Sequence, residues 1–352
     1  MAAISLENLT FSYPGADAPT VENLNLEIGD GEAHALLGAS GTGKTTLLNL
    51  LSGLLQPTGG KIRFGTQDVA ALAGRARNVA QVFQFPVLYE SMTVAQNLGF
   101  ALGITRARAA KAHARVNQIA QELDIEHLLD RKAQGLGLFE KQLVAVGKAL
   151  VKENTALVLL DEPLTAVEPK IKWRLRQTLL KAQHDLGLTM VYVTHDQTEA
   201  LTFADRVSVL TPRGIVQTGT PAEIYQSPTH EYVGHFVGSP GMNYIPAQIL
   251  GLSGGDTLGF RPEWLSALPA TANTAQHFAG RVMSARSQGT LAGERVGLTT
   301  LELMPTDSTP AAKLRVNLYG PIHWGQGETV PLRVNRYVLF KDQWQVGAGS
   351  FD

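Results

Sequence analysis

The stretch of this sequence best suited to chemistry is GASGTGKTT at residues 38–46. It fits the pattern G-x-x-x-x-G-K-[ST], whose glycines let successive backbone N–H groups converge on the phosphates of a nucleotide. Lys44 is expected to pair with the β- and γ-phosphates, and the Thr45 hydroxyl to ligate Mg²⁺. The residues expected to bind nucleotide here are Gly38, Ser40, Gly41, Thr42, Gly43, Lys44, Thr45 and Thr46. The pattern predicts a nucleoside triphosphate site that uses Mg²⁺.

The segments on either side of this loop agree with that prediction. Residues 34–37 are apolar and typical of a buried strand, and residues 47–51 continue as an apolar helix. The N-terminus of such a helix adds partial positive charge beside the phosphates. A glycine-rich turn without a ligand is the alternative, but it would not require the lysine, the threonine and the helix in this order.

Two acids follow a second apolar run. Residues 157–160 are LVLL, and Asp161 and Glu162 come directly after them. The carboxyl ends of parallel strands meet at one edge of a sheet, where the phosphate loop also lies. We expect Asp161 to hold Mg²⁺ directly or through water, and Glu162 to orient or deprotonate an attacking water. On its own, the run could also be a strand that ends in a solvated turn.

Gln84 and His195 each follow a further apolar run, residues 79–83 and 190–193. A lone histidine is most often structural, but one that ends a buried strand beside the two acids is placed to sense the γ-phosphate. The amide of Gln84 can reach Mg²⁺ or the attacking water. Both residues are therefore candidates for the same site.

Apolar periodicity divides the chain into two domains. Strand-like and helical runs alternate as far as residue 237, which predicts an α/β domain with a parallel sheet, and the stretch from about 86 to 154 is mainly helical. Residues 238–352 contain short β-like segments such as 280–283, 313–316 and 337–340, which suit a small antiparallel barrel. The strands expected in the first domain lie at 4–11, 22–28, 61–65, 79–84, 156–160 and 190–193, and the helices at 106–123, 142–151 and 169–186.

The composition is that of a soluble globular protein. Of the 352 residues, 44% are hydrophobic and 17% are charged, and the net charge of −1 gives no reason to expect a nucleic-acid partner. The absence of cysteine excludes disulfides and thiolate metal sites. No apolar stretch approaches the ~20 residues that a membrane helix needs. We expect a cytosolic protein whose contact with a membrane depends on a partner.

The order and spacing of the loop at 38–46, Gln84, Asp161, Glu162 and His195 resemble the ATPase subunits of ABC transporters, over residues 3–236. The resemblance implies ATP as the nucleotide. It also implies that Tyr13 stacks on adenine, although a tyrosine in a turn needs no such role.

The same resemblance implies partners. Residues 85–97, with Pro86, Tyr89 and Met92, would form the groove that receives a helix of a membrane subunit. From the residues alone, this segment is an apolar loop broken by proline. The implied assembly contains a second ATPase subunit, two transmembrane permease subunits and a periplasmic solute-binding protein that acts through them. The chain would lie on the cytoplasmic face of the inner membrane.

The later sequence resembles the sugar-importer branch of the family. Residues 233–243 resemble the junction to its C-terminal OB-like (TOBE-type) regulatory domain, and residues 260–263, FRPE, resemble a motif in that domain. Segments 81–89, 161–165, 172–173 and 238–243 resemble one of the two ATPases of proteobacterial glycerol importers. This implies import of a small polyol or sugar, with glycerol as the narrowest expectation. The domain either binds a regulator or acts as a spacer that stabilises a dimer.

The family also carries a signature, LSGGQ, that closes over the ATP of the other subunit. The corresponding residues here are Leu136, Gly137, Leu138, Phe139 and Glu140. The serine is replaced by Gly137, both glycines are replaced by bulky residues, and Glu140 adds a negative charge. Hydrogen bonds to charged groups contribute about 1.5–3 kcal/mol each, so this signature is expected to close poorly over phosphate.

A literal LSGGD occurs at residues 252–256. It follows His195, lies in the β-rich domain and leads into residues 257–260 rather than into a helix, so we interpret it as a hairpin turn. The aspartate usual in the loop after the acidic pair is Glu168 here, which keeps the charge and lengthens the side chain.

An intact ATP site combined with a poor signature predicts asymmetry. We expect a heterodimer with one stronger and one weaker site, in which a different ATPase supplies the lid over this chain's ATP. One alternative is the ATPase of a different carbohydrate or glycerol-phosphate importer, working as a homodimer whose altered signature still functions. Another is a mainly regulatory ATP-binding subunit with weak hydrolysis. A soluble ABC ATPase that acts on nucleic acid or ribosomes is a further alternative, disfavoured by the single phosphate loop and near-neutral charge.

Overall fold

The computed structural model describes residues 2–102, 109–165, 167–268, 277–287, 290–291, 294–295, 298–306, 313–319 and 324–350. The chain divides into two compact units, Met1–Pro221 and Ala222–Asp352. The boundary expected at 237–238 from the change in apolar periodicity stays a prediction.

The first unit is built on a sheet in the order β10-β9-β3-β8-β7-β6, six strands among the described residues. Strands β9, β3, β8, β7 and β6 run parallel, and β10 is antiparallel to β9. Strands β3 and β8 are buried along their whole length, as expected for a sheet covered on both faces. The strands are β3 (Ala33–Gly38), β6 (Val79–Val82), β7 (Leu157–Asp161), β8 (Met190–Thr194), β9 (Arg206–Thr211) and β10 (Gly214–Gly219).

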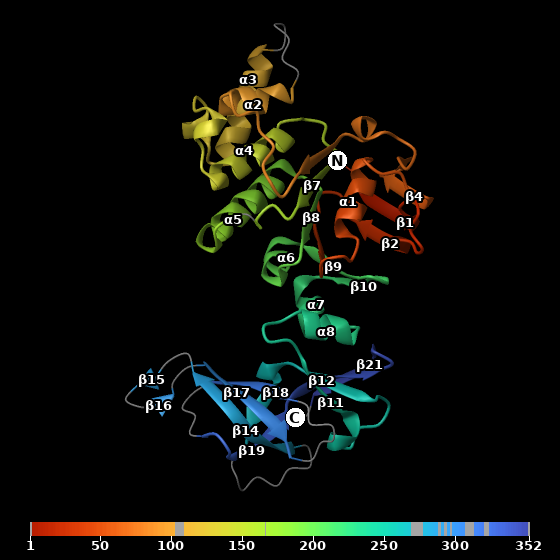
Figure 1. Cartoon of the computed structure of the whole chain (residues 1–352), viewed down its shortest axis with the longest axis vertical. Coiled ribbons are helices and arrows are strands. Elements are labelled where there is room, and N and C mark those ends of the chain that lie inside the picture. Colours follow the sequence, from red (N-terminus) through yellow and green to blue (C-terminus); the bar gives the residue numbers. More distant parts are fainter. Residues whose placement is uncertain are drawn as a thin grey trace. The chain divides into compact units, whose positions relative to one another are not determined.

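A second, antiparallel sheet has the order β2-β1-β4-β5. Its strands are β1 (Ile4–Phe11), β2 (Val21–Ile28), β4 (Gly59–Phe64) and β5 (Gln67–Asp68). Helix α1 (Lys44–Ser52) joins the two sheets in one core, because its buried leucines cluster with Leu6 and Leu24 of the second sheet and with Leu159 of β7. The start of α1 is thereby fixed against the central sheet (Figure 1).

The helices between β6 and β7 differ from expectation in two places. Residues 85–97 were interpreted as a loop, but α2 (Val94–Phe100) begins there, with Thr93 and Gln96 forming a capping box. Helix α4 (Leu138–Leu150) begins four residues before the predicted start at 142. Helix α3 (Ala109–Glu122) was predicted from 106, and residues 103–108 lie outside the described residues. The short 3-10 turns are η1 (Gly74–Arg77), η3 (Glu126–Leu128) and η4 (Ala133–Gly135).

Two more helices complete the first unit, α5 (Pro169–Leu186) and α6 (Gln197–Phe203). Helix α5 agrees with the predicted range of 169–186. Its N-terminus has Glu168 as the N-cap residue and a proline in the first turn, and Gly187 with φ 59° ends it. Proline in the first turn commonly begins a helix, and glycine directly after the last turn commonly ends one.

The second unit is β-rich, and the predicted α/β plus OB-like fold class is confirmed. Sheets with the orders β11-β12-β20-β21 and β13-β19-β14-β17-β18 enclose an apolar core that includes Phe260, Leu301 and Leu332. The strands are β11 (Asn243–Pro246), β12 (Thr257–Phe260), β13 (Leu265–Ala267), β14 (His277–Ser287), β15 (Thr290–Leu291), β16 (Glu294–Arg295), β17 (Leu298–Pro305), β18 (Leu314–Tyr319), β19 (Thr329–Val334), β20 (Arg336–Lys341) and β21 (Trp344–Ser350).

The FRPE motif anchors the helices at the start of this unit, α7 (Pro221–Gln226) and α8 (Glu231–Phe236). Arg261 is fully buried, its Nε donates to the Tyr225 carbonyl at 3.1 Å, and Nη1 donates to the Gly234 carbonyl at 3.0 Å. The Tyr225 hydroxyl donates to Glu263 at 2.7 Å. The two segments that resemble the family's junction and its regulatory-domain motif are thus in direct contact. The other 3-10 turns are η5 (Ala247–Leu250) and η6 (Pro262–Trp264).

Candidate active site

The phosphate loop leaves β3 and enters α1, as its sequence predicts. Gly41 and Gly43 have φ of 82° and 88°, a backbone region that favours glycine. A Cβ on Gly43 would lie 3.1 Å from the Thr20 carbonyl, and one on Gly38 would lie 2.7 Å from the Leu210 carbonyl. These glycines therefore let the chain turn closely around the end of the sheet.

Lys44 begins α1, and its ammonium lies inside the loop. It is 6% exposed, and its Nζ donates to the carbonyls of Gly38 and Ala39, each at 2.8 Å. Burial lowers the pKa of Lys44, and the nearby charges of Glu162 and Asp161 offset part of that effect. The loop carbonyls thus hold the ammonium at the position from which it would meet phosphate.

The hydroxyls of the loop differ in exposure. Ser40 and Thr45 are exposed, whereas Thr42 is buried and donates to the Ala39 carbonyl at 3.0 Å. Buried Thr46 lies within hydrogen-bond distance of Tyr13, with 3.2 Å between Oγ1 and the phenol oxygen. The exposed hydroxyls remain accessible to a ligand.

Tyr13 is 41% exposed and packs edge-on against Phe11, with ring centroids 4.8 Å apart. Its contact with Thr46 places the ring beside α1, next to the phosphate loop. An exposed ring held in this way offers a surface on which a base can stack. The adenine contact implied by the family resemblance stays a prediction.

The carboxyl ends of β3, β7 and β8 bring the predicted polar residues to one edge of the sheet. Asp161 is opposite Val193 in the parallel register, and Leu37, next to the loop, is opposite Thr194. His195 follows β8 directly, and its Nδ1 lies 3.0 Å from Oε1 of Glu162. The acids and the histidine thus meet beside the phosphate loop.

Glu162 has an unusual backbone. Its φ is 45°, uncommon for a residue with a side chain, and its N–H donates to the Val193 carbonyl at 3.0 Å. Oε2 of the carboxylate accepts the Thr165 hydroxyl at 3.1 Å, and Oε1 contacts His195. Backbone strain of this kind persists where the surrounding contacts enforce it, and here they aim the carboxylate.

Asp161 ends β7 and is half-buried. Burial raises the pKa of Asp161, the negative charge of Glu162 raises it further, and the positive charge of Lys44 lowers it. A carboxylate that is short of counter-charge is suited to a cation.

Gln84 lies two residues after β6, in the bend that follows the strand, and is partly exposed. Gln142 of α4 is buried and donates to the Phe83 carbonyl at 3.4 Å, so α4 contacts the backbone next to Gln84. Strand β6 pairs with β7, which places Gln84 at the same edge as Asp161. The four polar residues predicted from strand ends therefore share one edge.

The residues present fit a magnesium ion. Within the described residues no group of three or more His, Asp or Glu side chains could hold a metal ion. Mg²⁺ instead keeps several waters and takes one or two carboxylates together with substrate phosphates. Asp161, exposed Thr45 and Gln84 offer such oxygen ligands beside the loop.

The altered signature lies at the N-terminus of α4. Gly137 is the N-cap residue, with φ −67°, and Leu138 and Phe139 form the first turn. Oε2 of Glu140 accepts the Gly137 N–H at 2.8 Å, while Oε1 lies 3.3 Å from Nη1 of Arg131. The helix N-terminus, where the family's signature would present N–H groups to phosphate, already has a carboxylate of its own chain.

LSGGD at residues 252–256 lies between η5 and β12 and leads into that strand, as predicted, although η5 makes the connection from β11 longer than a tight turn. Glu168 is exposed, and its carbonyl accepts the N–H of Lys172 at 3.1 Å in the first turn of α5.

A hollow of about 460 Å³ lies between β6, α2 and α4. Its lining includes Phe83, Val87, Phe100 and Lys148, and the first three are 45%, 61% and 53% exposed. Tyr89 lies against Phe100, with centroids 4.6 Å apart, and under the Lys148 ammonium at 4.7 Å. This apolar surface includes part of the segment that the sequence assigned to a membrane subunit.

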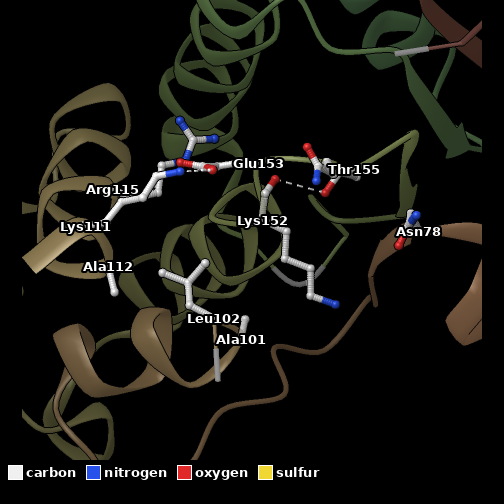
Figure 2. Close-up of a pocket in the computed structure, with 10 residues that line it drawn as sticks. Asn78, Ala101, Leu102, Lys111, Ala112, Arg115, Lys152, Glu153 and Thr155 are labelled. Carbon is white, nitrogen blue, oxygen red and sulfur yellow. Dashed lines mark hydrogen bonds and ion pairs between the residues drawn. The ribbon is translucent and has the colours of Figure 1, made fainter. Parts of the chain in front are cut away.

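A neighbouring cavity of about 560 Å³ lies among α2, α3 and the end of α4 (Figure 2). Its basic side chains are partly engaged, because Arg115 donates to the carbonyls of Leu150 and Val151 and Lys111 pairs with Glu153 at 2.8 Å. Figure 2 shows the Lys152 ammonium extending away from that pair. We assign no ligand to this cavity.

Sequence reasoning missed several residues that shape the site. The Thr165 hydroxyl donates to Glu162, and the Thr194 hydroxyl donates to Glu199 and accepts the N–H of Asp196 next to His195. Asn97 is buried and accepts the N–H of Tyr89 at 2.9 Å. The Thr93–Gln96 capping box was the available signal for α2 and hence for Asn97. The other contacts arise from tertiary packing, which strand and helix periodicity does not reveal.

Comparisons with known proteins agree with this geometry. The ABC transporter family model matches residues 21–165. The sn-glycerol-3-phosphate import ATP-binding protein UgpC of Chromobacterium violaceum is 43% identical over 248 residues, 70% of this chain and 67% of that protein. UgpC of Rhizobium meliloti is 39% identical and covers 80% of this chain and 83% of its own length. The diacetylchitobiose uptake ATP-binding protein MsiK of Streptomyces coelicolor is 41% identical, and the match spans 66% of that protein.

Solved structures give the same result. CbiO1 of Clostridium perfringens, part of the ABC transporter complex CbiONQ, is 28% identical with a TM-score of 0.59, over 64% of this chain and 90% of that chain. The ATP-binding cassette MJ0796, in a dimeric post-hydrolysis state bound to ADP and phosphate, is 26% identical with a TM-score of 0.54, over 62% and 98% of the two chains. The chain therefore belongs to the ABC transporter family, as an ATPase subunit of the carbohydrate and polyol importer branch.

Proposed function

We propose that this chain binds and hydrolyses ATP to drive an ABC importer of a small polyol or sugar, with glycerol as the narrowest candidate. The observation that carries the proposal is the convergence of the phosphate loop, Asp161, Glu162 and His195 at one edge of the central sheet. Phosphoryl transfer to water needs four kinds of group. These are glycines that let the backbone approach phosphate, a buried lysine, a carboxylate that binds a cation, and a base beside a histidine.

In this proposal Lys44 and the N–H groups of the loop bind the phosphates, and Asp161, Thr45 and Gln84 hold Mg²⁺. When bound, Mg²⁺ neutralises charge on the β- and γ-phosphate oxygens. The Glu162 carboxylate orients the attacking water and accepts its proton. His195 holds that carboxylate through Nδ1 and is placed to contact the γ-phosphate with the rest of its ring. Tyr13 supplies the adenine contact.

The lid over the γ-phosphate comes from a second ATPase subunit. This chain's own segment at 136–140 has no hydroxyl at Gly137, exposes Leu138 and directs the Glu140 carboxylate to the N-terminus of α4. Those features support a weak lid for the partner's ATP, because a carboxylate at that position repels phosphate. The partner is therefore a non-identical ATPase, and the complex has one stronger and one weaker site.

Contact with the membrane comes through permease subunits. Within the described residues no helix is long and apolar enough to span a bilayer. The hollow lined by Phe83, Val87 and Phe100 is suited to an amphipathic helix of a permease, since exposed apolar patches mark interaction sites. We place the chain on the cytoplasmic face of the inner membrane, bound to two permease subunits that receive solute from a periplasmic binding protein.

Several relatives are named for different solutes, namely sn-glycerol-3-phosphate and diacetylchitobiose. The choice of glycerol rests on the sequence resemblance of segments 81–89, 161–165, 172–173 and 238–243. Residues 238–352 form the regulatory domain of the subunit in this proposal, and residues 1–237 form the ATPase domain with its helical part at about 86–154.

Purification of the assembled complex through an affinity tag on this chain tests the proposal. We expect to recover a second, different ATPase, two permease subunits and a solute-binding protein that retains glycerol. Recovery of this chain as the only ATPase would contradict the heterodimer. A different bound solute would contradict the glycerol assignment while leaving the ATPase assignment intact.

A further inference from the structure

A buried carboxylate lies behind His195, and the mechanism above does not use it. Glu199 of α6 is 2% exposed. Its Oε1 accepts the Lys172 ammonium at 2.9 Å, and its Oε2 accepts the hydroxyls of Tyr192 and Thr194, each at 2.9 Å. A carboxylate removed from water is unfavourable unless it is paired, and here several groups compensate for its burial.

Thr194 connects this carboxylate to the backbone at His195. Its hydroxyl donates to Glu199 and accepts the N–H of Asp196 at 2.9 Å. The Asp196 carboxylate in turn accepts the N–H groups of Thr198 and Glu199 at 2.8 and 3.3 Å. Hydrogen bonds therefore fix the residues on both sides of His195, which limits the directions in which its ring can point.

Lys172 connects the same carboxylate to α5. That helix starts after Glu168, and its first turn is closed by the bond from Lys172 N–H to the Glu168 carbonyl. Glu162 lies just upstream, where its carbonyl accepts the N–H of Thr165 at 3.1 Å. Glu199 thus joins the first turn of α5, through Lys172, to the backbone beside His195, through Thr194.

We propose that Glu199 is a positioning residue for ATP hydrolysis. Through Thr194 it holds His195 in hydrogen-bond contact with Glu162, and through Lys172 it fixes that histidine relative to the first turn of α5. The inference rests on the proposed roles of Glu162 and His195. Glu199 acts only through its neighbours, because its carboxylate is enclosed by side chains of its own subunit.

Tyr192 provides a matched control for this idea. Its hydroxyl bonds to the same Oε2 of Glu199 as Thr194 does, at the same distance of 2.9 Å. Its ring packs on Phe203, with centroids 4.7 Å apart, and its hydroxyl donates to Glu199 rather than to the backbone beside His195. Removing the tyrosine hydroxyl therefore perturbs the buried carboxylate without releasing the histidine.

The test compares Thr194→Val, which removes the link, with Thr194→Ser, which keeps the hydroxyl. Steady-state hydrolysis of Mg-ATP is measured in the complex purified through a tag on this chain. The His195→Ala variant gives the loss of turnover expected when the histidine contributes nothing. Thr194→Val is expected to lower kcat by about 10- to 100-fold, because a small misplacement of a catalytic group has effects of that size. The KM for ATP should change little, and Thr194→Ser and Tyr192→Phe should retain wild-type kcat.

Glu199→Gln has nearly the same shape as the wild type and provides a second test if the valine variant assembles poorly. It should also lower kcat with little change in the KM for ATP. Thermal unfolding of each variant separates loss of stability from loss of turnover. Wild-type turnover in both Thr194→Val and Glu199→Gln, with His195→Ala inactive, would overturn the inference. Equal loss in Thr194→Ser and Thr194→Val would also overturn it, because shape rather than the hydroxyl would be responsible. Normal turnover in His195→Ala would instead refute the proposed role of the histidine itself.

Discussion

Nδ1 of His195 lies 3.0 Å from Oε1 of Glu162, although the two residues are 33 positions apart in the chain. Each follows a strand of the central sheet, β8 for the histidine and β7 for the glutamate. Pairing of these parallel strands brings the two side chains together beside the phosphate loop. The proposed ATP hydrolysis depends on this arrangement, in which the base Glu162 is held next to a buried lysine and a half-buried aspartate.

The loop glycines allow a direct test of the phosphate site. Gly41 has φ 82° and no heavy atom within 4 Å of an added Cβ, and Gly251 in the second unit has φ 68° and equally open space. Alanine at either position is strained by about 1–2 kcal/mol. We expect both variants to lose similar stability, whereas only Gly41→Ala should weaken nucleotide binding. Equal ATP affinity of the two variants, measured by calorimetry, would contradict the assignment of the loop.

Asp161 should destabilise the protein when no ligand is bound and stabilise it when Mg-ATP is bound. Burial raises the pKa of Asp161, and so does the charge of Glu162, which means that the fold disfavours the charged form. We therefore expect Asp161→Asn to raise the midpoint of thermal unfolding without ligand. The same variant should lose most of the stabilisation that Mg-ATP gives to the wild type. A variant that is destabilised without ligand and still stabilised by Mg-ATP would refute this account.

The signature segment can accept the hydroxyl that it lacks. A Cβ on Gly137 would have Glu140 Oε2 as its nearest neighbour, at 3.7 Å, so serine fits there. Gly135→Ser is a matched control, because it adds a hydroxyl in equally open space outside the α4 N-terminus. One hydrogen bond to phosphate contributes about 1.5–3 kcal/mol, so Gly137→Ser should raise turnover at the weaker site by about 10-fold or more. Transport that stays unchanged or falls would show that the altered signature works as it stands.

The pair formed by His34 and Glu32 at the start of β3 should make stability depend on pH. His34 is fully buried and lies 2.6 Å from Glu32 and 2.8 Å from Ser208. Burial raises the pKa of Glu32, but its hydrogen bonds with His34 and Gly29 outweigh that effect and leave the pKa below its usual value. Stability from a lowered carboxyl pKa is present above the unfolded-state pKa and is lost as the pH falls through the folded-state value.

Glu32→Gln should therefore lower the free energy of unfolding at neutral pH and reduce its decline in acid. Urea unfolding across the acid range measures this, with Glu27→Gln as the control, because Glu27 lies on exposed β2 surface and bonds only Ser5 among the contacts described. If the free energy of unfolding falls equally steeply in acid for wild type and Glu32→Gln, the pair contributes nothing to the pH dependence.

The sequence predicts the position of the polar residues where the sheet topology alone determines it. Parallel strands must place Asp161, Glu162 and His195 at the edge that also carries the loop, so an apolar run followed by a polar residue was sufficient. The same logic located Gln84.

The start of α4 and the whole of α2 could not be placed from apolar periodicity alone. Helix α4 begins at Leu138, because Gly137 is its N-cap residue and Glu140 closes onto the Gly137 N–H. Glu199 was missed for a different reason. A glutamate in a short helix usually faces water, and only the packing of Lys172, Tyr192 and Thr194 around it makes burial possible.

The most direct test of the account is the rate of phosphate release from Mg-ATP by the complex that contains Glu162→Gln. A general base contributes about 10²- to 10⁴-fold, so turnover at this chain's site should fall by that factor. ATP binding should persist, because Lys44 and the loop are unchanged, and the ATP-bound complex should accumulate in its closed form. Turnover at the wild-type rate with Glu162→Gln would contradict the central claim that this carboxylate activates the attacking water.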